Sequence, residues 1–176
     1  MTSPGALPPS QIFAARLIQG HRVASGLNGN PRFPGGTLQM QTPHFLARGL
    51  DIRVFHRGTL NVSIAPLVYR VLRPRLTFRD VQWHPVEPKE DFSFFDVRLL
   101  APAPAPVSGL VYFPHPETKP EHFQAPGVLE LLLPYVEGLS YGIELTLEIP
   151  RDQMAIELPK RDDVQSGIGQ QGRSTH

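Results

Sequence analysis

The chain contains no cysteine in its 176 residues. Disulfide bonds, thiolate zinc sites and cysteine nucleophiles are therefore excluded. Long hydrophobic runs are also missing, because no apolar stretch reaches the roughly 18 residues that a membrane-spanning helix requires. The first eleven residues do not combine a basic segment with an apolar one, so they do not predict a signal peptide. The sequence therefore predicts a cytoplasmic protein that has no membrane partner.

Charge is scarce as well. Only 19% of the residues are charged, and 17 basic side chains are balanced by 16 acidic ones. The basic residues are scattered along the chain, so the sequence does not predict a large nucleic-acid-binding surface.

Proline and glycine are abundant, with 20 and 15 residues respectively. They separate short apolar runs, which predicts many turns between short elements and disfavours helical bundles. The length matches one domain of about 150 residues. We expect a flexible N-terminal arm over residues 1–11, a single domain over 12–158 and a flexible polar tail over 159–176.

Strand patterns dominate the central region. Aliphatic residues alternate with polar ones over 60–64 and 143–149, as in half-buried strands. The apolar residues of 92–99 change face midway, which predicts a bulge, and 110–113 is a short continuous apolar run. Residues 11–19 fit a helix or a strand, and Pro134 limits any helix over 128–136 to about two turns. These patterns predict a mainly β, closed or nearly closed barrel with one or two short helices.

The segment Ser25-Gly26-Leu27-Asn28-Gly29-Asn30 is the first candidate site. Glycine and asparagine tolerate positive φ angles, so the backbone N–H groups of such a loop can converge on a phosphate. The lysine of a P-loop is missing, and an ordinary turn-rich loop explains the same composition.

The second candidate follows Gly58. Thr59, Asn61 and Ser63 share one face of the strand predicted over 60–64. Their oxygen atoms suit a hard cation such as Mg²⁺, or a phosphate, although such a face usually meets water. A similar string, Gly36-Thr37-Leu38-Gln39, is a rival position for a strand of this kind.

Two further segments carry ionisable groups. The loop that follows Pro114 is restricted by prolines, and His115, Glu117 and His122 could together bind a metal, although a solvated polar loop is the simpler interpretation. Glu130 is a lone carboxylate in an apolar run. It must be paired, face a cavity or point outward.

The order of these segments resembles the archaeal CTP-dependent riboflavin kinases. The landmarks are Val23 to Leu27, Gly58 to Ile64, Gly109 to Phe113 and Val128 to Pro134, and the similarity covers roughly Gly20 to Ile149. The string Gly58-Thr59-Leu60-Asn61 carries most of it. The resemblance implies a small six-stranded cradle-loop β-barrel, a fold that agrees with the strand patterns.

The same resemblance implies a function. Members of the family transfer the terminal phosphate of CTP to the 5′-hydroxyl of riboflavin, which yields FMN and CDP, with Mg²⁺ as cofactor. It implies that Thr59 and Asn61 bind the metal and that Thr118 and Glu130 contact the flavin, with Glu130 near the acceptor hydroxyl as the catalytic carboxylate. The segment 25–30 would lie along the nucleotide, and residues 135–142 would close over the cytosine side.

The chain departs from the family at two positions on the nucleotide side. Asn28-Gly29-Asn30 replaces a Gly-Glu-Gly string, and Arg57 replaces a proline or acidic residue before Gly58. Two alternatives therefore remain beside the kinase. One is a barrel that binds a nucleotide or flavin without turnover. The other is a metal-dependent hydrolase or isomerase that uses His115, Glu117 and His122.

Overall fold

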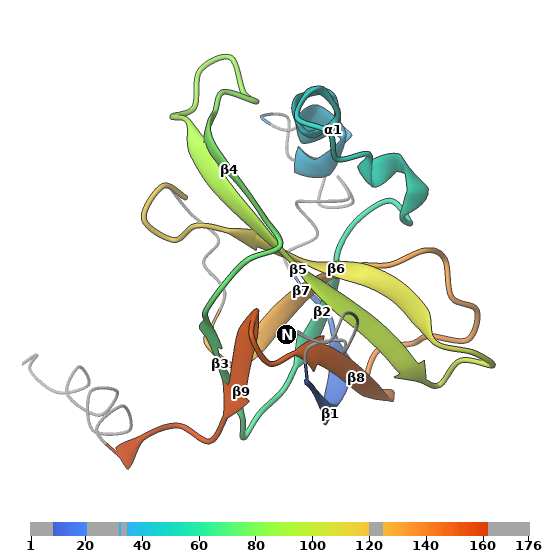
Figure 1. The fold of residues 1–176 in the computed structure, drawn as a ribbon. Coiled ribbons are helices and arrows are strands. Elements are labelled where there is room, and N and C mark those ends of the chain that lie inside the picture. The colour runs from blue at the N-terminus through green and yellow to red at the C-terminus, as the bar shows by residue number, and fades with distance from the viewer. Residues whose placement is uncertain (1–8, 21–31, 33–34, 120–124, 162–176) are drawn as a thin grey trace, which may run out of the picture.

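Six antiparallel strands form a closed barrel (Figure 1). The computed structural model describes residues 9–20, 32, 35–119 and 125–161. Around the barrel the strands are β5 (Glu90–Ala101), β6 (Val107–Pro114), β7 (Val128–Leu132), β2 (Leu60–Ser63), β1 (Ser10–Ile18) and β8 (Glu144–Pro150). The pairing of β8 with β5 closes the ring. The protein is mainly β, as the sequence predicted.

Smaller elements surround the barrel. Strand β4 (Leu76–Val81) pairs with β5, and β3 (Val68–Val71) forms a separate two-stranded sheet with β9 (Met154–Glu157). Helix α1 (Thr37–Ala47) and the 3₁₀ turn η1 (Ile52–Val54) lie at the upper end in Figure 1, beside β4. In the part of the chain that the structure describes, no helix has the length and apolarity needed to cross a membrane.

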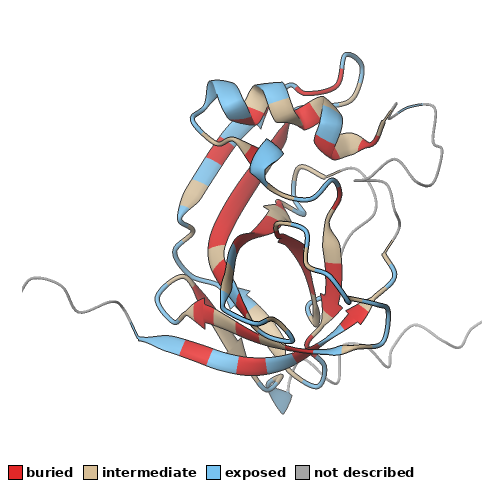
Figure 2. Ribbon diagram, turned by 90° about the vertical axis from the view of Figure 1, so that its right-hand side faces the viewer, coloured by how far each residue is buried: buried red, intermediate tan, exposed pale blue. Residues whose placement is uncertain are grey.

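The long strand β5 serves two hydrophobic clusters. Phe95, Val97 and Leu99 point into the barrel, whereas Phe92 and Phe94 belong to a second cluster under α1. Figure 2 shows buried residues on the strands around the barrel interior and on the helix above it. The predicted bulge midway along 92–99 is wrong, because β5 pairs with β6 without a register shift there. The apolar residues change face because both faces of the strand are covered.

Helix α1 closes the second cluster. Its side chains Leu38, Gln41 and Phe45, at helical spacing, are buried. The ring of Phe45 lies edge-on to Phe92 and Phe94, with centroid distances of 5.0 and 5.3 Å. This packing attaches the helix to the outer face of the barrel wall.

The structure decides two segments that the sequence left open and corrects other local expectations. Residues 11–19, which fit a helix or a strand, are mostly in strand β1, and 128–132 form strand β7. Thr37-Leu38-Gln39 lies in α1, so the rival position for a metal-binding strand is wrong. Strand β1 begins at Ser10, inside the segment assigned to the arm. The rest of the expected arm, residues 1–8, and most of the expected tail, 162–176, lie outside the described residues.

The buried carboxyl group of Glu90 supplies a stability test. The indole N–H of Trp83 donates to Glu90 Oε2 at 2.6 Å, and the Glu90 side chain is almost fully buried. Burial raises the pKa of Glu90 above its usual value near 4.5, opposed by the Trp83 hydrogen bond and the charge of Lys119. The folded state therefore favours the protonated form of Glu90, and the contribution of Glu90 to the free energy of unfolding falls as the pH rises above about 4.5.

We expect Glu90→Gln to remove this loss, because glutamine stays neutral and still offers an oxygen to Trp83. Urea unfolding at pH 4.5 and pH 7 should show that the variant gains stability over the wild-type protein as the pH rises. The other carboxylates contribute equally to the pH dependence of stability in the variant and in the wild-type protein. An identical pH dependence in the two would contradict the prediction.

Candidate functional site

Thr59, Asn61 and Glu130 lie together where β2 meets β7. Asn61 is the register partner of Glu130 across the two strands. The hydroxyl of Thr59 donates to Glu130 Oε1 at 3.1 Å. Asn61 is 8% exposed and Glu130 is 9% exposed, so neither side chain points to bulk water. The strand pairing thus brings Thr59 and Asn61 to one place with Glu130, which is 71 residues from Thr59 in sequence.

Two glycines shape the surroundings of Asn61. Gly58 has a φ of 103°, a conformation that favours glycine, and it leads the chain into Thr59 and β2. Gly20 follows β1, and a Cβ atom at this position would lie 2.2 Å from Asn61 Nδ2. A larger residue at position 20 would require the Asn61 side chain to move. The candidate phosphate loop, Ser25 to Asn30, begins five residues further along the chain and lies outside the described residues.

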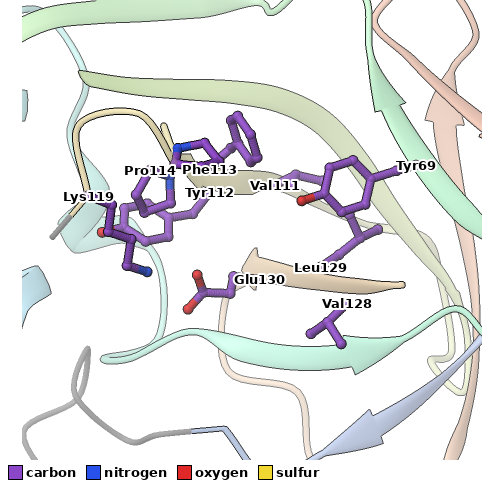
Figure 3. Close-up of a pocket in the computed structure, with 10 residues that line it drawn as sticks. Tyr69, Val111, Tyr112, Phe113, Pro114, Lys119, Val128, Leu129 and Glu130 are labelled. Atoms are coloured by element: carbon purple, nitrogen blue, oxygen red, sulfur yellow. The ribbon is translucent and has the colours of Figure 1, made fainter. Parts of the chain in front are cut away.

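A pocket opens beside Glu130 (Figure 3). Its enclosed volume is small, about 20 Å³, and the wider space of about 380 Å³ at its mouth includes open solvent. Its charged lining residues are Glu130 and Lys119, and its walls are apolar or aromatic, formed chiefly by Tyr69, Tyr112, Phe113, Pro114 and Pro116. Aromatic and proline rings around a few polar groups are typical of sites for planar organic ligands.

The two tyrosines of the pocket are held in the neutral form. Burial raises the pKa of Tyr69, and the negative charge of Glu130 raises it further. Burial raises the pKa of Tyr112 well above its usual value, with added contributions from Glu130 and Glu90. The hydroxyl of Tyr112 donates to Gln41 Oε1 at 2.9 Å. Neither phenol can act as a base near neutral pH. Among the described lining residues, the Glu130 carboxylate is therefore the group that can accept a proton.

A larger groove of about 550 Å³ lies between α1, η1 and the segment before β2. Its floor is apolar and includes Leu38, Ile52 and Leu132, while its basic lining residues are Arg53, His56 and Arg57. The groove extends to Gly58, the residue before Thr59. Thr59 therefore connects the two hollows: its backbone adjoins the groove and its hydroxyl bonds to Glu130 in the pocket.

Arg57 holds one side of the groove together. Its Nη2 atom donates to the carbonyl of Gly35 at 2.7 Å and to Gln39 Oε1 at 2.8 Å. The departure from the family pattern before Gly58 thus has a structural role, because it ties the start of α1 to the entry of β2. On the neighbouring segment, the ring of Tyr135 is 74% exposed and lies 5.8 Å from that of His56.

The loop after Pro114 is fixed by hydrogen bonds within the protein. The Nε2 atom of His115 lies 2.7 Å from Ser93 Oγ, and Nδ1 lies 3.5 Å from Arg79 Nη1. Arginine can only donate, so Nδ1 accepts and the proton resides on Nε2, which donates to Ser93. In this tautomer the Nε2 proton of His115 points toward Ser93, which does not favour a serine-hydrolase role for the pair.

The structure gives little support to a metal site in this loop. Burial lowers the pKa of His115, so its ring is neutral near pH 7, but both nitrogens face Ser93 and Arg79. Glu117 is exposed, and His122 lies outside the described residues. Among residues 9–20, 32, 35–119 and 125–161, no group of three histidine, aspartate or glutamate side chains could hold a metal ion.

Thr118 does not line the Glu130 pocket, but its neighbour Lys119 does. The hydroxyl of Thr118 accepts from the backbone N–H of Asp91 at 2.9 Å and donates to the carbonyl of His115 at 3.3 Å. Its flavin contact stays a prediction. Sequence reasoning did not select Lys119, Tyr69 or Tyr112, because they gather at the pocket only once β3, β6 and β7 are assembled.

Comparisons of the chain with protein-family models and with curated proteins give no match. Its function must therefore be inferred from the barrel, the two hollows and the side chains between them.

Proposed function

We propose that the protein is a Mg²⁺-dependent phosphotransferase that transfers the terminal phosphoryl group of CTP to riboflavin, yielding CDP and FMN. One observation carries the proposal: Thr59, Asn61 and Glu130 converge between an aromatic pocket and a basic groove. A two-substrate transfer needs two adjoining sites that meet at the reacting groups. The six-stranded barrel is also the fold that the sequence resemblance implies.

The side chains fit the cofactor. Mg²⁺ prefers oxygen ligands and keeps several waters or phosphate oxygens in its coordination shell. Thr59, directly before β2, offers a hydroxyl, and Asn61, within β2, offers an amide oxygen across from the Glu130 carboxylate on β7. Bound there, Mg²⁺ would neutralise phosphate charge, the main requirement of phosphoryl transfer.

The two hollows suit the two substrates. The enclosed part of the pocket is too small for a flavin, so in this proposal the planar ring system lies at the pocket mouth, beside Tyr69, Phe113 and two prolines. Arg53, His56 and Arg57 line the groove that reaches Gly58, a place for an anionic nucleotide. Tyr135 beside His56 offers an aromatic face for the base. The resemblance also implies a nucleotide contact for residues 25–30, which lie outside the described residues.

The reaction then needs one proton acceptor. The 5′-hydroxyl oxygen of riboflavin forms a bond to the terminal phosphorus while the bond from that phosphorus to the bridging oxygen breaks, and CDP leaves. Glu130 accepts the hydroxyl proton, so charge and atoms balance. The Thr59 hydroxyl orients this carboxylate through the 3.1 Å hydrogen bond.

A second candidate is a barrel that binds flavin or nucleotide without turnover. The Thr59–Glu130 hydrogen bond favours it, because the two groups satisfy each other without a metal. The Asn28-Gly29-Asn30 string in the candidate phosphate loop is also unlike that of the kinases.

A thermal-shift titration tests whether the two sites exist. We expect riboflavin and CTP with Mg²⁺ each to raise the melting temperature, because a ligand at a hundred times its Kd stabilises the folded state by roughly 2.7 kcal/mol. ATP at equal concentration should shift it less than CTP. No shift with any flavin or nucleotide would contradict both candidates, whereas shifts without FMN formation would favour the second.

A further inference from the structure

Lys119 provides a positive charge that the proposed reaction has not used. Among the described residues that line the Glu130 pocket, two carry a charge, and Lys119 is the cationic one. In Figure 3 its side chain extends toward the Glu130 carboxylate. The residue is half-buried, and its charge reaches Glu90 as well, where it opposes the effect of burial on the pKa of that carboxyl group.

The chain before Lys119 is held rigidly. The backbone N–H groups of Thr118 and Lys119 both donate to the carbonyl of His115, at 3.1 and 3.0 Å. The His115 N–H donates to the carbonyl of Asp91 at 2.9 Å, and the Asp91 N–H donates to the Thr118 hydroxyl. This turn is thereby fastened to the start of β5 at two points. A lysine that follows a fixed turn loses less conformational freedom on binding a ligand.

The pocket needs such a charge if it holds a phosphorylated product. A phosphate group that arrives beside Glu130 is repelled by the carboxylate, and a nearby cation offsets this repulsion. The Nη2 atom of Arg57, in the neighbouring groove, already donates to Gly35 and Gln39. Lys119, in contrast to Arg57, lines the Glu130 pocket.

We propose that Lys119 binds the phosphate group of the flavin product, and the same group during transfer, at the mouth of the pocket that it shares with Glu130. The inference rests on the proposed function, since it names the cation that receives the transferred group. It predicts that Lys119 distinguishes FMN from riboflavin, two ligands that differ only in that phosphate. A lysine with a purely structural role would affect both ligands alike.

The test is a fluorescence titration of riboflavin and of FMN with the full-length protein in Mg²⁺. Lys119→Met should weaken FMN binding by about ten-fold or more, the range of a charged hydrogen bond, and change riboflavin binding by less than about three-fold. Lys119→Arg should retain most of the FMN affinity. The matched control is Lys89→Met, which removes an exposed lysine outside the pocket and should change neither affinity.

The outcomes separate the two claims. If Lys119→Met leaves the ratio of FMN to riboflavin affinity unchanged, the role of Lys119 is wrong while the flavin site stands. If the wild-type protein binds neither flavin, the proposed function fails and the role of Lys119 fails with it. Retained riboflavin binding in Lys119→Met also shows that the variant is folded.

Discussion

Replacing Glu130 with glutamine is expected to lower the rate of FMN formation by about 10²–10⁴-fold, the usual contribution of a general base. Glutamine keeps the size of the side chain and an oxygen that can accept from Thr59, but it cannot take the proton of the acceptor hydroxyl. The measurement is the initial rate of FMN formation from riboflavin and CTP in Mg²⁺, at saturating concentrations of both substrates.

The matched control is Glu117→Gln, the same chemical change on the exposed part of the 114–119 turn. It should leave the rate within about two-fold of the wild-type value, because surface changes away from a site have small effects. Asn61→Ala should raise the Mg²⁺ concentration needed for activity and remove most turnover. A Glu130→Gln variant as active as Glu117→Gln would show that Glu130 takes no proton.

Replacing Phe45 with alanine is expected to lower the free energy of unfolding by about 3–5 kcal/mol, the usual cost of removing a buried aromatic ring. Phe45 is fully buried and its ring contacts Phe78, Phe92 and Phe94. It attaches α1 to the barrel, so its loss should also weaken the groove that α1 borders. Such a loss is a large part of the 5–15 kcal/mol that stabilises a typical domain.

Urea unfolding monitored by Trp83 fluorescence measures this effect. Leu46→Ala is the matched control, since Leu46 is the next residue in the helix and is 41% exposed. It should cost well under about 1 kcal/mol in free energy of unfolding. Equal losses in the two variants would show that α1 does not depend on the second cluster.

The barrel could be predicted from the sequence because its strands alternate clearly. The runs over 60–64 and 143–149 carry aliphatic residues at every second position, and both form barrel strands. Helix α1 was missed for a physical reason. Its buried face includes Gln41, whose polarity hides the helical spacing, and the hydrogen bond from Tyr112 that allows this burial comes from a distant strand. Pro43 within the helix obscures it further.

The candidate site was only partly accessible from the sequence. Thr59, Asn61 and Glu130 stand out as oxygen-bearing side chains in apolar runs, but their convergence depends on the pairing of β2 with β7. Lys119 had no such signal, because it is one charged residue in a polar turn. Its place beside Glu130 depends on the tertiary packing, which puts that turn at the mouth of the Glu130 pocket.

The most direct test of the account is the reaction itself, with purified wild-type protein, riboflavin, CTP and Mg²⁺. The account predicts that FMN and CDP form in equal amounts, and that both disappear when Mg²⁺ is removed by chelation. Absence of FMN above the protein-free control, at substrate concentrations that shift the melting temperature, would contradict the kinase and leave a binding barrel.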